Sequence, residues 1–480
     1  MVSRTRQSGH EMSPAAVLVI VCTGVMLASL DLFIVNVALP DIATDLGVHS
    51  LADLSWVLNA YAIVYAAFLV IFGRLADRFP REQGFLLGVA IFVLASAACG
   101  MATSVAMLVT FRVVQAAGAA LLTPTSLGLL LASTPPERRH AAVRIWAAVG
   151  GLGAALGPVM GGLLVAADWR WVFLVNVPIG VTALLVGWRR LPHVPGHPVP
   201  VPDLPGALLI TVGAGMLTLG LVKGVDWGWG STTTIAVLSA AAAAVVLFVA
   251  HTARHRNPLI DRSLFALRAF TGASAVALVF SVAFGAMLLS RVFWAQDVWG
   301  WSPLQTGLSM TPGPLMVPVF AMLSGRLVPR FGPGPVIAAG CTVFAIGAAW
   351  WAFAAGADPD YIGGLLGGTL LTGIGTGLAL PTIMATGSAS LPAHSFATGS
   401  AVVNMLRQIG LAVGVAVFIA VLGTPQETSD AVHAYAVTSV LIAAIALAAG
   451  FIALALMGRR RVAATPTDTR AAATQATTTG

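Results

Sequence analysis

Gly73-Arg74-Leu75-Ala76-Asp77-Arg78-Phe79 is a short charged stretch between two long apolar runs, and it has a second copy in the chain. The copy is Gly325-Arg326-Leu327-Val328-Pro329-Arg330-Phe331, which also lies between two apolar runs. Charged side chains are costly in lipid, so both copies must lie where the chain leaves a membrane. Because Arg is enriched in cytoplasmic loops, we expect both to face the cytoplasm. The repeat predicts a membrane protein with two similar halves.

The composition agrees with a membrane protein. Of the 480 residues, 58% are hydrophobic and 9% are charged, and the mean hydropathy is +0.91. A chain this apolar cannot hide its surface in one core, so lipid must surround most of it. The formal net charge of +7 would also suit a nucleic-acid-binding protein. The basic residues are spread between the apolar runs, however, so we expect no nucleic-acid partner.

Motifs of the common enzyme classes are missing from the sequence. The only lysine, Lys223, follows Val222, which excludes the Gly-Lys pair of a P-loop. There is no Gly-x-Ser-x-Gly nucleophile motif. The nine histidines lie in loops or at the ends of apolar runs without a spacing typical of metal ligands. We therefore expect neither an enzyme nor a metal site.

Fourteen apolar runs are long enough to cross a membrane as helices of about 20 residues. They cover residues 15–39, 54–73, 84–103, 106–131, 143–166, 171–188, 205–222, 233–251, 269–293, 305–325, 335–354, 362–386, 399–422 and 433–457. Of the 25 Lys and Arg residues, 20 fall on the side that holds both termini, whereas Arg170, Lys223 and Arg291 fall on the other. This asymmetry predicts that both termini are cytoplasmic. Ten tryptophans lie near the outer ends, which favours an aromatic belt.

The duplication extends beyond the charged stretch. Gly118-x5-Pro124-Thr125 recurs as Gly375-x5-Pro381-Thr382, 257 residues later. A half with six helices needs only about 180 residues, so an additional helix pair is expected between the halves. We predict a cytoplasmic N-terminal segment (1–14), a six-helix half (15–190), an inserted two-helix region (191–268), a second six-helix half (269–457) and a disordered cytoplasmic tail (458–480). The expected fold class is an all-α membrane protein with 14 transmembrane helices.

Three ionisable residues lie deep within apolar runs: Asp31, Arg112 and Arg407. Asp31 is nine residues before Pro40, which places it about 13 Å from the outer end of its helix. Arg112 lies at a similar depth, so the two side chains could form an ion pair. Since Arg stays protonated, Asp31 is the candidate proton carrier, and a static structural pair is the alternative. Arg407 could be held by backbone carbonyls, or it could attract an anion in a wet cavity.

Several motifs together resemble those of the fourteen-span drug:proton antiporters of the major facilitator superfamily. They are Leu30-Asp31-Leu32-Phe33-Ile34-Val35-Asn36-Val37-Ala38-Leu39-Pro40, Trp56-x4-Tyr61, the stretch Gly73 to Arg81, Arg112-x2-Gln115-x2-Gly118, Gly153-x3-Gly157-Pro158-x2-Gly161-Gly162, Trp169 to Gly180, and Asn404-x2-Arg407-Gln408. The resemblance covers almost the whole chain and is strongest in the first half. Two positions depart from the family pattern: Pro80 stands where Gly is usual, and Glu82 where a basic residue is usual.

The resemblance implies roles for four groups of residues. Proton coupling is assigned to Asp31 and Arg112. The substrate cavity would include Asn36, Trp56, Asn59, Tyr61, Gln115, Asn404, Arg407 and Gln408. The gating stretch would comprise Gly73, Asp77, Arg78, Arg81, Gly325, Arg326 and Arg330, and the antiporter motif Gly153, Gly157, Pro158, Gly161 and Gly162.

The function that the resemblance implies is export of a small, largely hydrophobic drug or antibiotic in exchange for protons. Rocking of the two halves around a central cavity would move the compound, and the proton gradient would drive it without a cofactor. We expect a monomer in the lipid bilayer of a bacterial cell membrane. A proton-coupled importer of an organic solute or anion, and a receptor that transports nothing, are the alternatives.

Overall fold

The computed structural model describes residues 14–48, 50–135, 138–196, 203–256, 258–259, 264, 266–389, 396–423 and 428–458. Within them lie the helices α1 (Pro14–Asp45), α2 (Leu51–Arg78), α3 (Arg81–Gly100), α4 (Val105–Ser133), α5 (Arg139–Val165), α6 (Trp171–Leu174), α7 (Asn176–Arg190), α8 (Leu204–Trp227), α9 (Thr232–Arg254), α11 (Arg268–Phe293), η2 (Trp294–Val298), α12 (Pro303–Met310), α13 (Pro312–Phe331), α14 (Pro333–Ala354), η3 (Tyr361–Leu366), α15 (Gly367–Ala389), α16 (Phe396–Leu422) and α17 (Thr428–Met457). The described part contains no strand. Most of the predicted terminal segments, 1–14 and 458–480, lies outside it.

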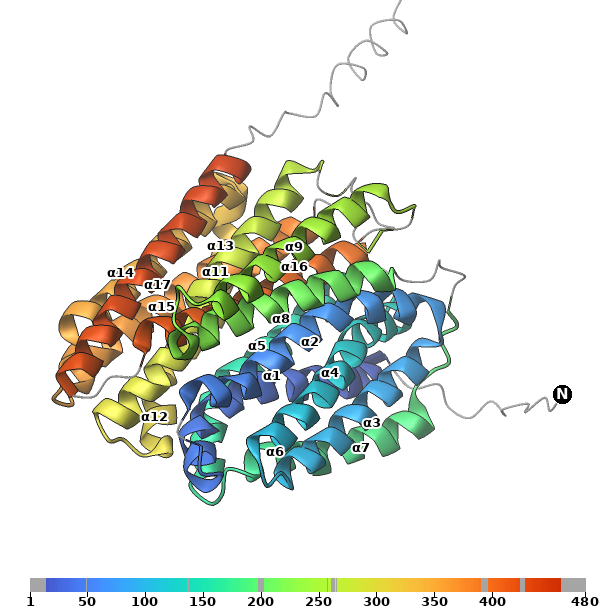
Figure 1. Ribbon diagram of the computed structural model, residues 1–480. Helices are drawn as coiled ribbons and strands as arrows, with labels where there is room; N and C mark the ends of the chain where they lie inside the picture. Colours follow the sequence, from blue (N-terminus) through green and yellow to red (C-terminus); the bar gives the residue numbers. More distant parts are fainter. Residues whose placement is uncertain are drawn as a thin grey trace, which may run out of the picture.

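The helices form two bundles with a helix pair between them in the chain (Figure 1). Helices α1 to α7 make the first bundle, in which α1 packs against α5 and α3 against α4. Helices α11 to α17 make the second, in which α11 packs against α16 and α14 against α15. Thirteen helical segments of the described part are long and apolar enough to span a membrane. The 27-residue α5 is not among these thirteen, and adding it gives the fourteen spans that the sequence predicted.

The duplication is visible in equivalent close contacts. In the first bundle, a Cβ built at Gly118 of α4 would lie 2.6 Å from the backbone nitrogen of Phe92 in α3. In the second, a Cβ built at Gly375 of α15 would lie 2.5 Å from the backbone nitrogen of Phe344 in α14. Real Cβ atoms do not come this close to backbone atoms, so each glycine lets its helix approach the next one.

The charged stretch that defines the repeat is helical, contrary to the loop expected from the sequence. Helix α2 continues through Arg78, and the Phe79 amide closes its last turn by donating to the carbonyl of Leu75 at 3.0 Å. The second copy likewise forms the end of α13. The backbone can stay helical where it leaves the lipid because its hydrogen bonds are internal, and only the charged side chains need water.

The two bundles meet along two seams. One seam is made by α2 and α16, and α8 packs against both of these helices (Figure 1). The Lys223 ammonium of α8 contacts the Asp53 carboxylate of α2 at 2.6 Å, which fixes one end of the inserted pair. The other seam is made by α5 and α12, where a Cβ at Gly162 would lie 2.6 Å from the carbonyl oxygen of Pro303. The inserted pair therefore covers one seam and not the other.

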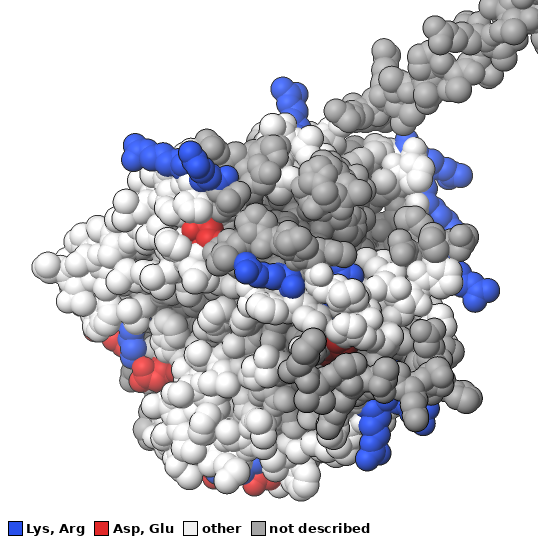
Figure 2. Space-filling view, turned by 90° about the vertical axis from the view of Figure 1, so that its right-hand side faces the viewer, with Lys and Arg blue, Asp and Glu red and all other residues white. Residues whose placement is uncertain are grey.

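Charged side chains are few on the surface and unevenly distributed. On the face shown in Figure 2, blue Lys and Arg side chains clearly outnumber red Asp and Glu side chains. Four of the ten tryptophans expected in an aromatic belt are buried instead, whereas Trp171, Trp227, Trp229 and Trp350 are exposed. Trp169, Trp294, Trp299 and Trp351 are buried, and the indoles of Trp299 and Trp351 donate to backbone carbonyls. These side chains close the outer ends of the bundles instead of lying in lipid.

The topology can be tested with single cysteines in a variant that lacks Cys22, Cys99 and Cys341. Thr232 is exposed at the start of α9, and Gln83 is exposed in the first turn of α3. We expect Thr232→Cys to react with a membrane-impermeant maleimide in intact cells, and Gln83→Cys to react only after the cells are made permeable. Equal labelling of the two cysteines in intact cells would contradict the predicted topology.

Candidate functional site

A buried charge network in the first bundle joins the two deep residues that the sequence singled out. The Arg112 guanidinium of α4 forms an ion pair with the Asp31 carboxylate of α1, and both side chains have 0% exposure. The Gln115 amide donates to Asp31 Oδ1 at 2.8 Å, and its carbonyl oxygen accepts from Arg112 Nη1 at 2.7 Å. The three side chains therefore bind one another in a closed triangle.

Two further polar side chains complete this network. Ser96 of α3 accepts a hydrogen bond from Gln115 Nε2 at 2.6 Å. Asn176, the first residue of α7, donates to Asp31 Oδ1 at 3.3 Å and to Ser96 Oγ at 3.4 Å. Neither residue was among the predicted site residues. Both lie in apolar runs, where a single Ser or Asn has no distinctive sequence signal, although Asn176 falls within the stretch that resembles the family's sixth-helix motif.

Arg112 is held on its other side by α2. Its Nε donates to the carbonyl oxygen of Val57 at 3.1 Å, and its guanidinium carbon lies 4.0 Å from the ring centroid of Tyr61. Tyr61 stacks on Tyr65, whose hydroxyl lies 3.1 Å from that of Thr123 in α4. Arg112 Nη2 and the Tyr61 hydroxyl are buried without a hydrogen-bond partner in the described part. These two groups can therefore still form hydrogen bonds. We call these six side chains the charge network: Asp31, Arg112, Gln115, Ser96, Asn176 and Tyr61.

The predicted antiporter motif holds α1 from the opposite side. A Cβ at Gly153 would lie 2.9 Å from the Met26 carbonyl oxygen, and one at Gly161 would lie 2.8 Å from that of Ile34. At Gly157 the added Cβ would lie 2.6 Å from Phe33 Cβ. Three glycines of α5 thus contact the segment of α1 that carries Asp31. Through Gly162 the same motif also reaches α12 in the second bundle.

The predicted cavity residues lie in different surroundings. Asn36 donates to carbonyls of its own helix, at 3.2 Å for Leu32 and 3.3 Å for Phe33. Asn59 has 0% exposure, and its Oδ1 lacks a described partner. Trp56 packs against the small apolar cluster where α2, α8 and α16 meet. These contacts do not define a common cavity, and the assignment of the three side chains to one stays a prediction.

Arg407 and its neighbours lie on α16. Arg407 Nε donates to the Asn404 side-chain oxygen at 3.0 Å, as their spacing of three residues allows. Gln408 is buried, and its Oε1 has no partner in the described part. Helix α16, which carries Arg407, packs against α2, which carries Tyr61 of the charge network and Tyr65.

The two copies of the charged stretch differ in their contacts. In the first, Arg81 Nη1 donates to the Gly128 carbonyl at the end of α4, at 3.3 Å, and Gly73 lies close to Ala401 of the second bundle. In the second, Arg326 and Arg330 are exposed, and a Cβ at Gly325 would meet nothing within 4 Å. The side chain of Asp77 lies outside the described part. Among the described residues, the first copy thus contacts both bundles.

The unusual Glu82 has a specific partner in this chain. Its carboxylate accepts from the Val194 amide at 3.0 Å and lies 2.7 Å from His193 Nδ1. The Arg81 amide donates in turn to the Val194 carbonyl at 3.1 Å. The departure from the family pattern therefore fixes the Pro-rich segment before α8 to the start of α3.

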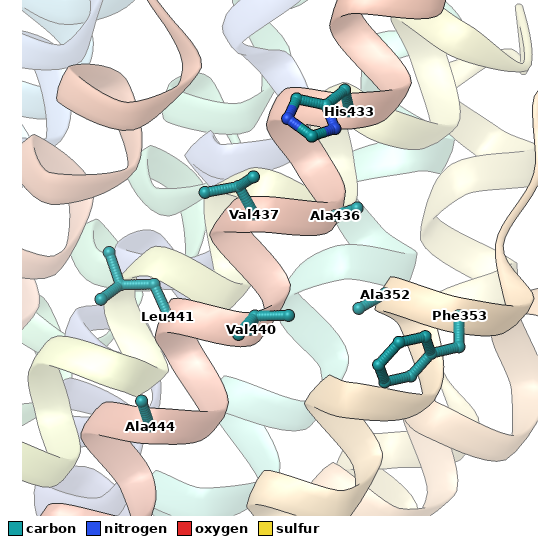
Figure 3. A pocket seen from close by; sticks show the side chains of 8 residues that line it. All are labelled: Ala352, Phe353, His433, Ala436, Val437, Val440, Leu441 and Ala444. Carbon is teal, nitrogen blue, oxygen red and sulfur yellow. The ribbon is translucent and has the colours of Figure 1, made fainter.

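A cavity of the described part lies in the second bundle, away from the charge network. It is an apolar groove of about 450 Å³ between α14 and α17, with His433 at one end (Figure 3). Its lining residues are Ala352, Phe353, His433, Ala436, Val437, Val440, Leu441 and Ala444. Phe353 is 86% exposed, so the groove opens to the outside of the bundle. Such a groove suits lipid contact, and it offers no charged group to a transported compound.

Comparison with known proteins identifies similar chains. The model of the family "Major Facilitator Superfamily" matches residues 21–415. The tetracenomycin C resistance and export protein of Streptomyces glaucescens is 35% identical over 88% of this chain and 78% of its own length. The cephamycin export protein of Amycolatopsis lactamdurans is 34% identical over 89% of each chain. Among solved structures, a transporter of the POT family, PepTSo, superposes with a TM-score of 0.68 at 15% identity, over 92% of this chain and 97% of that one.

Removing one partner of the buried pair should be worse than removing both charges. Arg112→Gln leaves Asp31 buried without its cation, which costs about 3–5 kcal/mol in comparable sites. The double variant with Asp31→Asn removes the uncompensated charge, so we expect it to regain part of the lost stability. Unfolding of the purified proteins in detergent would measure both. A double variant as unstable as Arg112→Gln would show that the two charges are not coupled.

The contact of α5 with α1 should be sensitive to one methyl group. Gly157→Ala forces α1 away from α5, and we expect a loss of about 1–3 kcal/mol in stability. Gly150→Ala is the matched control, because its Cβ would lie 3.4 Å from Val25, an ordinary contact. Thermal unfolding of the two variants should separate them, and equal stability would contradict close packing at Gly157.

Proposed function

Because this chain belongs to the Major Facilitator Superfamily, we propose that it exports a small drug-like or antibiotic-like compound across the membrane in exchange for protons. The relatives that carry this proposal are named as resistance and export proteins, and they align with this chain over most of their own length. The observation that supports proton coupling is the buried pair of Asp31 and Arg112. No cofactor is needed, because the proton gradient supplies the free energy.

The charge network suits a proton-dependent switch for a physical reason. With Asp31 ionised, the pair is neutral overall and joins α1 to α4. Protonation of Asp31 removes the negative charge and leaves Arg112 as a buried cation beside Gln115, the Val57 carbonyl and the rings of Tyr61 and Phe173. A buried cation without a counter-charge is strongly unfavourable, so the helices that surround Arg112 must rearrange or admit water. One proton can thus change the relative positions of α1, α2 and α4.

The rearrangement can reach the second bundle through three connections. On one side, α1 packs on the glycines of α5, and Gly162 and Pro158 of α5 contact α12. On the other side, α2, on which Tyr61 stacks on Tyr65, packs against α16, which carries Arg407. At the outer end, the Gln296 amide also donates to the Val37 carbonyl of α1 at 3.3 Å. The helix that carries the titrating group therefore also forms part of the contact between the bundles.

The compound is expected to be largely hydrophobic and not doubly positive. The Asp31 carboxylate is already neutralised by Arg112, and Arg407 adds a positive charge on α16 near the seam between the bundles. This arrangement offers little fixed negative charge to a dication. Each proton that enters across 100 mV releases about 2.3 kcal/mol, so one proton is enough to drive a useful gradient of a neutral compound.

The test removes the titrating proton while keeping shape and hydrogen bonding. In inside-out vesicles with an acidic interior, the wild-type protein should accumulate a member of a panel of neutral, anionic and cationic fluorescent compounds. We expect Asp31→Asn to reduce this accumulation to the level of vesicles without the protein, at equal amounts of protein in the membrane.

Asp430→Asn is the matched control, because Asp430 is exposed at the start of α17. It should transport normally. Full gradient-driven accumulation by Asp31→Asn would remove Asp31 from the coupling mechanism. If wild-type cells instead gained the compound, and a protonophore abolished this gain, the protein would be an importer.

A further inference from the structure

The inserted helix pair contains a cluster of potential metal ligands that transport does not use. Asp203 precedes α8, and His251 and His255 lie in the last turn of α9 and directly after it. Their ligand atoms all lie within 4.8 Å of one another. The spacing of the histidines in the sequence predicted no metal site. The third potential ligand, Asp203, lies 48 positions before His251 and cannot be recognised from that spacing.

The two histidines present their rings on the same side of α9. They are four residues apart, a spacing that brings two imidazoles together on one helical face, as in known zinc motifs. Their ring centroids are 4.9 Å apart, with a tilt of 31° between the planes. His251 Nε2 already lies 2.8 Å from Asp203 Oδ1, and 26% of its side chain is exposed. An ion could therefore approach from solvent at this side of the cluster.

The Asp203 carboxylate is held in place by backbone amides of two segments. Asp203 Oδ1 accepts from the Gly206 amide at 2.9 Å, and Oδ2 accepts from the Leu259 amide at 3.0 Å. These two backbone hydrogen bonds orient the carboxylate, as the outer hydrogen bonds of a metal ligand do.

We propose that Asp203, His251 and His255 form a site for a divalent ion of borderline softness, with Zn²⁺ as the expected occupant. Two imidazoles and one carboxylate suit Zn²⁺ and disfavour Mg²⁺ and Ca²⁺, which take oxygen ligands. Ligand bonds of about 2.0–2.2 Å place two donors of a tetrahedral ion about 3.4 Å apart. His251 Nε2 and Asp203 Oδ1, now 2.8 Å apart, would therefore separate slightly, and a rotation of the His255 side chain would bring its nitrogen closer. The fourth position would hold water.

The role that follows is structural. The ion would connect the start of α8, the end of α9 and the segment at Leu259, so it would fix the inserted pair at the end opposite to the contact between Lys223 and Asp53. Nothing in the site resembles a catalytic zinc centre with a nearby general base: the residue after His251 is Thr252, whereas the zinc metalloprotease motif has Glu there. The inference does not depend on the proposed transport.

The test measures zinc binding by the full-length protein in detergent, purified with a tag that contains no histidine and stripped of metal with a chelator. We expect one Zn²⁺ per chain by calorimetry, a higher unfolding temperature with Zn²⁺ than with Mg²⁺, and an intense visible absorption band with Co²⁺ in its place. His255→Ala should weaken Zn²⁺ binding by about tenfold or more and abolish the temperature shift. This variant leaves the hydrogen bond between Asp203 and His251 intact.

His433→Ala is the matched control, since this histidine lies in the outer groove of the second bundle. It should bind Zn²⁺ like the wild type. Asp203→Asn keeps one oxygen, which can accept one of the two backbone hydrogen bonds, but lacks the ligand charge, and it should also lose the site. The proposal is overturned if the wild type binds no Zn²⁺, if His255→Ala and His433→Ala bind it equally, or if Mg²⁺ stabilises the protein as much as Zn²⁺.

Discussion

The enclosure of one carboxylate and one guanidinium in the first bundle is the constraint on which the rest of the structure depends. Neither charge can be left alone in a region without water, so every helix around the pair must supply a donor or an acceptor. Helix α4 supplies Arg112 and Gln115, α3 supplies Ser96, and α7 supplies Asn176. The requirement fixes the relative depth of five helices, because Val57 of α2 must also present its carbonyl to Arg112.

The glycines of α5 hold α1 in a different way from the polar side chains around Asp31. Around Asp31, polar groups hold α1 through directed bonds, whereas α5 holds it through close backbone contact at Gly153, Gly157 and Gly161. Association of helices in lipid relies on such packing, since no hydrophobic force drives them together there. On one face, α1 is thus held by an ion pair that protonation can alter. On the other face, it is held by the glycine contacts of α5, along which it can slide. This combination suits a helix that moves during transport.

Hydropathy and depth were enough to predict the spans, the two halves and the proximity of Asp31 to Arg112. Each of these predictions follows from the free-energy cost of placing a charge or an unpaired backbone group in lipid. Single residues in the sequence are enough to show where that cost would arise. The partners Ser96 and Asn176 were missed because a small polar residue in an apolar run has many possible roles until the fold gives it neighbours. Long-range contacts were missed for a similar reason: Glu82 meets His193 across 111 positions in the chain. The buried tryptophans show that position near an interface does not determine which way an indole faces.

The position of α8 makes the molecule laterally asymmetric in the plane of the membrane. Two bundles that rock against each other have two flanks at which a bilayer-dissolved solute could approach their interface. Helix α8 lies along α2 and α16 and closes the first of these flanks to lipid. A hydrophobic compound that dissolves in a leaflet before it binds is therefore expected to reach the interface along the flank formed by α5. The inserted pair would thus block access from the lipid at one flank, so that the two flanks of the transporter differ.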